Sequence, residues 1–178
     1  MPDPDLYIFL KFHGIAGEST VKGHKDEIAV LSYEQAVNVA VIQSGGGGGL
    51  SSGIAKFSGV RFRKNVDVAS IPILLACVSG RHIQDARFTF SRGAGGFDFY
   101  KVTLEDVLLT NIAQRGGTGA QYPLSFNALD TGASSEGLLE EVTLDFSRIR
   151  WEHRVQLPDG RVGATTRGGW DIRTNKKL

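Results

Sequence analysis

The sequence predicts a mainly β fold, a barrel or a tight sandwich, that carries one helix. Three observations predict it. Apolar and polar residues alternate over many short segments. The 23 glycines among 178 residues are close to twice the usual share of about 7%, and glycine at this density favours turns over long helices. A single apolar run is bounded by helix start and stop signals. Because the chain has no linker or internal repeat, we expect one domain over residues 1–178.

The alternating segments are expected to form antiparallel strands joined by glycine-rich turns. The first has Phe9 on one face and Phe12 on the other, so we expect it to be covered on both sides. In the longest, the apolar positions change parity after Phe146, which predicts a bulge or bend near Ser147 and Arg148. In chain order, the expected strands are 6–12, 27–33, 37–41, 56–63, 85–91, 97–111, 141–156, 161–166 and 168–173.

One helix is expected between Ser70 and Gly80. Ser70 is a favourable N-cap, Pro72 suits a first turn, and Gly80 stands where a left-handed residue ends a helix. The stretch between them, Ile71–Val78, is almost wholly apolar. We therefore expect this helix to be buried on most sides against the sheet.

Two segments fit no regular element. Five consecutive glycines, Gly45–Gly49, lie within Ser44–Gly53, and glycine loses more backbone entropy on ordering than any other residue. We expect this stretch to be a mobile loop in the free chain, which a partner can order. The second segment, Arg115–Gly137, is a long excursion rich in glycine and serine.

The charge pattern argues against nucleic-acid and membrane partners. Twenty basic and nineteen acidic residues give a net charge of +1, and no block of like charge exceeds three residues, so we expect no nucleic-acid binding. No apolar run approaches the ~20 residues of a transmembrane helix, and the first residues lack the basic and apolar parts of a secretory signal. We expect a chain made and folded in the cytoplasm, without membrane insertion, whose export uses another route.

No combination of residues has the pattern of a catalytic, cofactor or metal site. The glycine run lacks the lysine of a phosphate-binding loop. Cys77, the one cysteine, lies in the apolar run and is expected to be a small core residue. We therefore expect no enzyme activity, no cofactor and no metal. Four histidines, His13, His24, His82 and His153, are expected at loop ends or the surface. The acidic pairs Glu105–Asp106 and Glu140–Glu141 are expected to be solvated and to pair with arginine across strands. Trp151 and Trp170 are expected in the core or an interface.

Several segments carry a family resemblance when they are taken together in chain order. They are FLKFHGIAGES (Phe9–Ser19), the strand region His24–Tyr33, the glycines Gly45–Gly49, ASIPILLACVSGRH (Ala69–His82), VTLDF (Val142–Phe146) and GWDIRTNK (Gly169–Lys176). In this order and spacing they resemble the Hcp family, the tube proteins of type VI secretion systems. Two segments depart from the family pattern, because Arg115–Gly137 is longer, with an added QYPLSF, and Tyr33–Val41 lacks a tryptophan.

The resemblance implies a small β-barrel of two antiparallel sheets with one flanking α-helix, similar to a phage tail-tube subunit. It also implies homohexameric rings that stack into a tube, which a sheath expels under a spike and which can carry effector proteins in its pore. Secretion would then use this apparatus and no signal peptide. Two other functions stay open: a ring-shaped effector chaperone or receptor that does not stack and, last, a secreted β-barrel enzyme. The segment expected to contact a neighbouring subunit or the next ring is Gln43, Ser44, Gly45, Gly46, Gly47, Gly48, Gly49, Leu50, Ser51 and Ser52.

Overall fold

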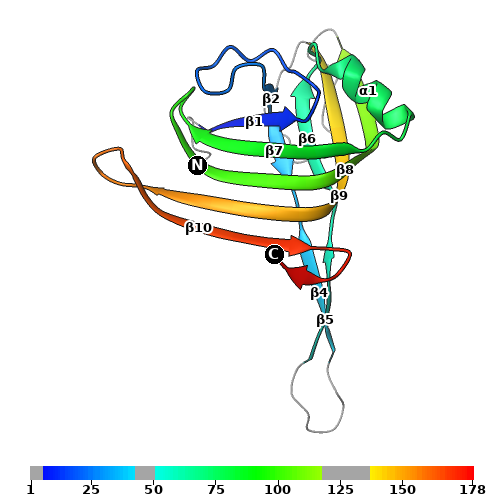
Figure 1. Cartoon of the computed structure of the whole chain (residues 1–178). Coiled ribbons are helices and arrows are strands. Elements are labelled where there is room, and N and C mark those ends of the chain that lie inside the picture. Colours follow the sequence, from blue (N-terminus) through cyan, green and yellow to red (C-terminus); the bar gives the residue numbers. More distant parts are fainter. Residues whose placement is uncertain (1–5, 43–50, 118–136) are drawn as a thin grey trace.

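The structure is a computed structural model that describes residues 6–42, 51–117 and 137–178. Its elements confirm the mainly β class with one short helix (Figure 1). In chain order they are β1 (Leu6–Phe12), β2 (Ile28–Val30), β3 (Ser32–Glu34), β4 (Val37–Ile42), β5 (Ser51–Phe57), β6 (Val60–Asn65), α1 (Ser70–Val78), β7 (Ile83–Arg92), β8 (Phe97–Gly117), β9 (Gly137–Gln156), β10 (Val162–Asp171) and β11 (Lys176–Lys177).

All strand pairs in the described ranges are antiparallel, and they form two sheets. The large sheet runs β11-β10-β9-β8-β7-β1-β2. Strand β6 pairs with the first part of β9, on the same edge as β10, and β3 pairs with β6. The small sheet is β4 with β5. The expected second strand, 27–33, is divided, because β2 pairs with β1 whereas β3 pairs with β6. The strands therefore curl toward a barrel without closing it through one continuous ladder.

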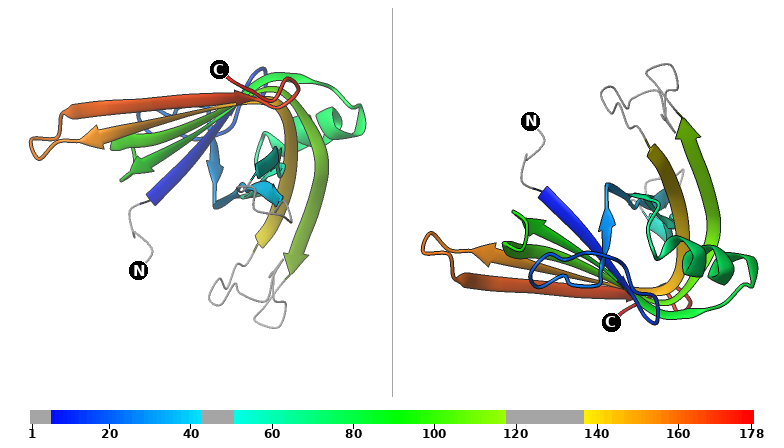
Figure 2. Two further views of the ribbon diagram at one scale, coloured as in Figure 1. Left: turned by 90° about the horizontal axis from the view of Figure 1, so that it is seen from below. Right: turned by 90° about the horizontal axis from the view of Figure 1, so that it is seen from above.

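The two longest strands, β8 and β9, bend together and connect the two halves of the large sheet (Figure 2). β9 pairs with β6 as far as Leu144 and with β10 from Arg148 onward, which explains the change of apolar parity in this strand. The bend lies where it is predicted, but the register shift of the β8–β9 pair falls between Leu109 and Asn111 instead. Asp106, which accepts a hydrogen bond from the Ser147 hydroxyl, has a φ of 55°, a backbone conformation that aspartate tolerates better than most residues.

The core fills the space between the two halves of this bent sheet. Leu10, Phe62, Phe88 and Leu104 are completely buried in it, and each comes from a different strand. Strand β1 is covered on both faces, as predicted. Phe12 packs into the core, whereas Phe9 on the opposite face stacks on the His24 ring with 4.0 Å between centroids.

The helix differs from the prediction in its cap and in its burial. Its N-cap is Ala69, and the Asp67 carboxylate accepts the Ala69 N–H, so Ser70 is the first helical residue rather than the cap. Gly80 has a φ of +61°, the left-handed conformation expected after a helix. Only Ser70, Ile73 and Ala76 of the helix are fully buried, so the expectation of burial on most sides is wrong. An all-apolar segment does not reveal which of its faces will be left uncovered.

Candidate functional site

A buried charged network fixes the start of α1 on strands β6 and β9. The Lys64 ammonium, whose side chain is 0% exposed, lies 2.9 Å from Glu140 Oε2 and 2.7 Å from Asp67 Oδ1. It also donates to Ser70 Oγ at 2.9 Å, and the Ser70 hydroxyl donates to Glu140 Oε2 at 2.7 Å. These contacts use the first helical residue as a link between the helix and the sheet.

The ionised form of Glu140 is stabilised inside this network. Burial raises the pKa of a carboxyl group, but hydrogen bonds from Gln114, Lys64 and Ser70 outweigh it and hold the pKa of Glu140 below its usual value. The expected solvation of the pair Glu140–Glu141 is therefore wrong, since both residues are buried. The expected pairing with arginine across strands is confirmed for Glu141, whose Oε2 lies 3.1 Å from Nε of Arg63 on β6. Sequence reasoning missed Lys64 as the partner of Glu140, because the register that places these two residues opposite each other joins positions 76 residues apart.

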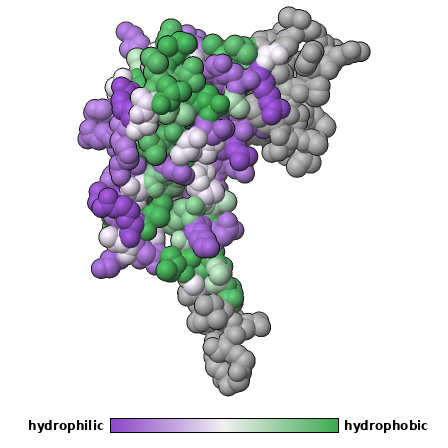
Figure 3. Space-filling view, turned by 90° about the vertical axis from the view of Figure 1, so that its right-hand side faces the viewer, coloured by the Kyte–Doolittle hydropathy of each residue, from purple (hydrophilic) through white to green (hydrophobic). Residues whose placement is uncertain are grey.

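The outer side of α1 presents an apolar surface, which we call the helix patch. It consists of Val68, Ile71, Leu75 and Val78, and the three helical members are exposed by 63%, 60% and 74% respectively. In Figure 3 hydrophobic residues gather over this end of the molecule. Contiguous exposed apolar residues of this kind mark interaction surfaces more often than isolated ones do.

Strands β4 and β5 form a hairpin arm that stands away from the rest of the chain (Figure 1). Within the described ranges these two strands pair only with each other. Val37, Val39 and Val41 on β4 and Ile54 on β5 are exposed. An isolated two-stranded hairpin is at best marginally stable in water, so the arm gains stability from any surface that covers it.

The base of the arm is anchored by aromatic contacts. The Phe57 ring stacks on Trp151 with 6.3 Å between centroids and meets Phe146 edge-on at 6.4 Å. Trp151 and Trp170 are partly buried against the core, in agreement with the prediction for both. The arm is thus fixed where it leaves the sheet and uncovered farther out.

Of the predicted contact segment, residues 43–52, the structure describes Ser51 and Ser52. Ser51 and Ser52 begin strand β5, in register with Ile42 and Val41. The expected mobile loop Ser44–Gly53 is corrected at its end, because residues 51–57 form strand β5. Residues Gln43 to Leu50, with the five glycines, lie outside the described residues, as do residues 118–136 of the expected Arg115–Gly137 excursion.

The histidines and acidic side chains do not form a nucleophile–base pair in the described part of the chain. Asp106 accepts hydrogen bonds from both His82 Nδ1, at 2.8 Å, and Ser147 Oγ. An imidazole that serves as general base has to contact the hydroxyl that it activates. The Asp106 carboxylate lies between the His82 imidazole and the Ser147 hydroxyl and keeps them apart. These two hydrogen bonds lower the pKa of Asp106. Among the described residues, no group of three His, Cys, Asp or Glu side chains is placed to hold a metal ion.

His24 lies near the end of the loop between β1 and β2, one of its two predicted positions, but not at the surface. It is buried, with Nδ1 2.8 Å from Glu27 Oε2 and Nε2 3.0 Å from Asp98 Oδ1. The imidazole joins the loop after β1 to the start of β8.

Helix α1 spans nine residues, and the described residues include no helix long and apolar enough to cross a membrane.

Comparisons with known proteins agree on one family. The family model described as "Type VI secretion system effector, Hcp" matches residues 9–153. Protein hcp1 of Pseudomonas aeruginosa is 31% identical over 172 residues, which cover 94% of this chain and 96% of that protein.

Solved structures extend the likeness to the fold. A structure described as that of a type six secretion system protein superposes with a TM-score of 0.83 at 26% identity, covering 97% of this chain and 99% of the other. Hcp1 from Salmonella typhimurium superposes with a TM-score of 0.73 at 28% identity, covering 98% and 99%. The matched sequence, the curled β sheets and the single short helix lead to one conclusion: this chain belongs to the Hcp family of type VI secretion system proteins.

Proposed function

We propose that this chain is a structural subunit of a type VI secretion tube, which forms homohexameric rings that stack and are expelled. The hairpin arm is the observation that carries the proposal. A pair of strands with four exposed β-branched apolar residues, anchored only at its base, suits insertion against a neighbouring subunit. Membership of a family whose members are secretion tube proteins supports the same function.

The helix patch supports self-association independently of the arm. Its uncovered isoleucine, leucine and valine side chains lie at positions 71, 75 and 78, on one side of the helix. Burying such side chains contributes roughly 25 cal/mol per Å² of apolar surface. The net charge of +1 causes little repulsion between identical subunits.

In the proposed assembly, the end of the arm at residues 43–52 reaches an adjacent subunit or the next ring. Glycine at five consecutive positions allows the connection to adopt whatever backbone conformation the neighbouring surface requires. The remaining proposed partners are the spike and sheath components of the machine and effector proteins in the pore. Secretion through the apparatus would follow from expulsion of the tube.

Stiffening the glycine run tests the role assigned to the arm. In the variant, alanine and proline residues replace Gly45–Gly49, and ring stacking is followed by electron microscopy. We expect single rings or free subunits in place of stacked particles. A control with serine at the same positions keeps a flexible connection and is expected to stack. Normal stacking of the stiffened variant would contradict the contact assigned to residues 43–52.

A further inference from the structure

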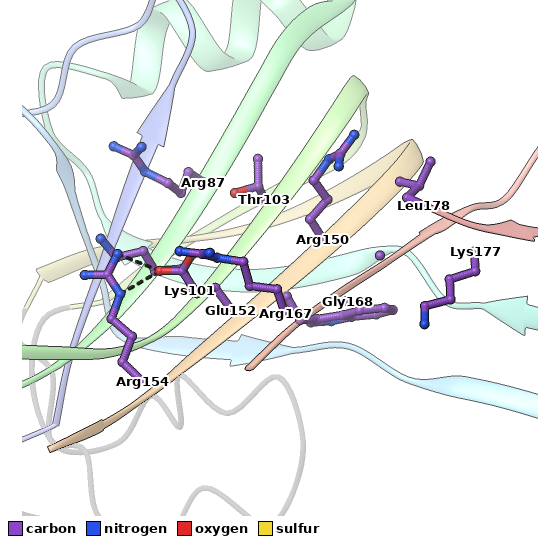
Figure 4. A pocket seen from close by; sticks show the side chains of 12 residues that line it. Arg87, Lys101, Thr103, Arg150, Glu152, Arg154, Arg167, Gly168, Lys177 and Leu178 are labelled. Carbon is purple, nitrogen blue, oxygen red and sulfur yellow. Dashed lines mark hydrogen bonds and ion pairs between the residues drawn. The ribbon is translucent and has the colours of Figure 1, made fainter. Parts of the chain in front are cut away.

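A basic groove lies on the solvent-facing side of the large sheet, away from the core. Its volume is about 410 Å³, and strands β7 to β11 all contribute to it. Glu152 is the one acidic side chain among the described residues that line it. Six cations line the same groove (Figure 4): Arg87, Lys101, Arg150, Arg154, Arg167 and Lys177.

The strand register makes a slot inside this groove. Thr103 on β8 is the direct neighbour of Arg87 on β7 and of Arg150 on β9. The two arginines are therefore two strand spacings apart, about 10 Å, with a small hydroxyl-bearing residue between them. Figure 4 shows Thr103 between these two side chains. Beyond Arg150 the next neighbour is Gly169, and the Leu178 side chain occupies the space above it, since a Cβ at Gly169 would lie 3.1 Å from the Leu178 Cβ.

The cations of the groove keep hydrogen-bond donors for a ligand. Arg150 Nε donates to Glu105 Oε1 at 2.8 Å, and an Arg87 Nη atom lies 3.9 Å from Glu27. A guanidinium carries five N–H donors, so each of these contacts occupies only part of the group. Both arginines extend into solvent, with 44% and 52% of their side chains exposed.

Glu152 neutralises only part of this charge. It lies 2.6 Å from Arg154 and 2.7 Å from Arg167, and the hydrogen bond from Arg167, followed by that from Arg154, lowers the pKa of Glu152 despite partial burial. In the lining, one carboxylate stands against six cations. Three carboxylates beside the groove, Glu27, Asp98 and Glu105, also contact Arg87, Lys101 and Arg150 respectively. The six cations still outnumber these four carboxylates, although the chain as a whole is close to neutral.

We propose that the slot formed by Arg87, Thr103 and Arg150 binds a carboxylate side chain in an acidic segment of a partner polypeptide. The arginines of this sheet face already contact carboxylates of their own chain, which shows that their geometry suits this group. All three residues come from one subunit, so the proposal goes beyond ring assembly and does not depend on it.

A polypeptide fits the groove better than a nucleic acid does. Nucleic-acid binding uses an extended basic surface and exposed aromatic rings for base stacking. This chain has a net charge of +1. Trp151, the aromatic residue of the groove lining, stacks on Phe57 and is thereby engaged with the base of the arm. The patch is local, as recognition of a few acidic side chains requires.

Binding of a fluorescein-labelled oligoglutamate peptide to the intact chain, followed by fluorescence anisotropy at low salt, tests the proposal. We expect the double variant Arg87→Gln/Arg150→Gln to weaken binding by about tenfold or more, since charge-assisted hydrogen bonds are lost. The control Arg161→Gln removes an 80% exposed cation of the β9–β10 turn, outside the groove, and is expected to change affinity by less than about twofold. Equal effects of the two changes would overturn the proposal.

Two variants of Thr103 test whether peptide binding depends on the space in the slot or only on the positive charge of the groove. Thr103→Leu fills the slot and leaves every charge in place, whereas Thr103→Ser keeps both the space and the hydroxyl. We expect weaker peptide binding for leucine only, with circular dichroism showing that both variants are folded. Unchanged binding by the leucine variant would contradict the slot. Binding of an oligothymidine probe more tightly than the peptide would overturn the choice of a polypeptide partner.

Discussion

Lys64 carries a charge in the protein interior, where a charged group without a partner is strongly destabilising. Its ammonium is fully buried and is surrounded by Glu140, Asp67 and Ser70. Breaking a buried ion pair by removing one partner costs about 3–5 kcal/mol, because the other charge stays buried without compensation. Replacing both partners by apolar residues avoids that cost.

The first prediction concerns this pair. Lys64→Met is expected to lower the free energy of unfolding by about 3 kcal/mol or more. Lys64→Met/Glu140→Leu is expected to recover part of this loss, since the Asp67 carboxylate still loses its partner. Urea unfolding at fixed protein concentration measures both. Arg161→Met, at an exposed ion pair with Asp159, is the control and is expected to cost less than about 1 kcal/mol. A double variant as unstable as the single one would show that the paired charges are themselves stabilising.

The second prediction concerns acid pH. The Arg148 guanidinium hydrogen-bonds to Asp171, and together with the Thr174 N–H it lowers the pKa of that carboxyl from 3.8 to about 2. A carboxyl whose pKa is lower in the folded state stabilises the fold above the unfolded-state pKa and loses that contribution as the pH falls. We therefore expect unfolding to become easier between about pH 4 and pH 2.

Asp171→Asn should reduce this acid dependence and should also lower stability at neutral pH. Urea unfolding at pH 7 and at pH 3 measures the difference for the wild type and the variant. Asp145→Asn, at an exposed position of β9, is the matched control and should keep the wild-type slope. An acid dependence identical in all three proteins would exclude the Arg148–Asp171 contact as its source.

At the scale of elements, α1 ends because Gly80 adopts a left-handed conformation. An added Cβ at Gly80 would meet no atom within 4 Å, so only the backbone conformation disfavours a side chain there. Gly80→Ala is expected to cost about 1 kcal/mol. Gly168→Ala is the matched control, since Gly168 also has open space around its Cα but no positive φ. Thermal unfolding should separate the two variants, and equal midpoints would contradict the account of the helix end.

The hairpin arm gives a prediction about assembly rather than folding. Val41 and Ile54 are 65% and 67% exposed, so Val41→Asp and Ile54→Asp should leave the subunit folded. Both changes should lower the mass of the assembly in solution, because burying an unpaired charge in an apolar contact is costly. Asn38→Asp adds the same charge to the same strand at an exposed polar position and should preserve the assembly. Light scattering after size exclusion measures all three, and unchanged mass for every variant would remove the arm from the interface.

Local patterns in the sequence predict the elements well and their partners poorly. Alternation identifies β1, β4 and β7, and Gly80 marks the helix end, because these signals depend on neighbouring residues alone. The division of β2 from β3, the burial of Glu140 and the exposed side of α1 depend on which distant strands pair. The basic groove is invisible in the sequence for the same reason, since its cations come from five strands.

At the scale of the whole molecule, the described chain leaves two apolar surfaces uncovered. The helix patch and the hairpin arm lie at separate places on the molecule (Figures 1 and 3), so they can meet two different neighbours. A ring requires each subunit to present two different, complementary surfaces to its neighbours, and stacking requires further contacts between rings. The two surfaces therefore suit the closed, stacked assembly that the proposed function requires.

The native mass of the purified chain, measured by light scattering after size exclusion, tests the central claim of ring assembly most directly. The account predicts a mass of about 115 kDa, six times the 19.2 kDa of one chain, or a multiple of it, with ring-shaped particles in electron micrographs. A monomer of about 19.2 kDa at every concentration would contradict it.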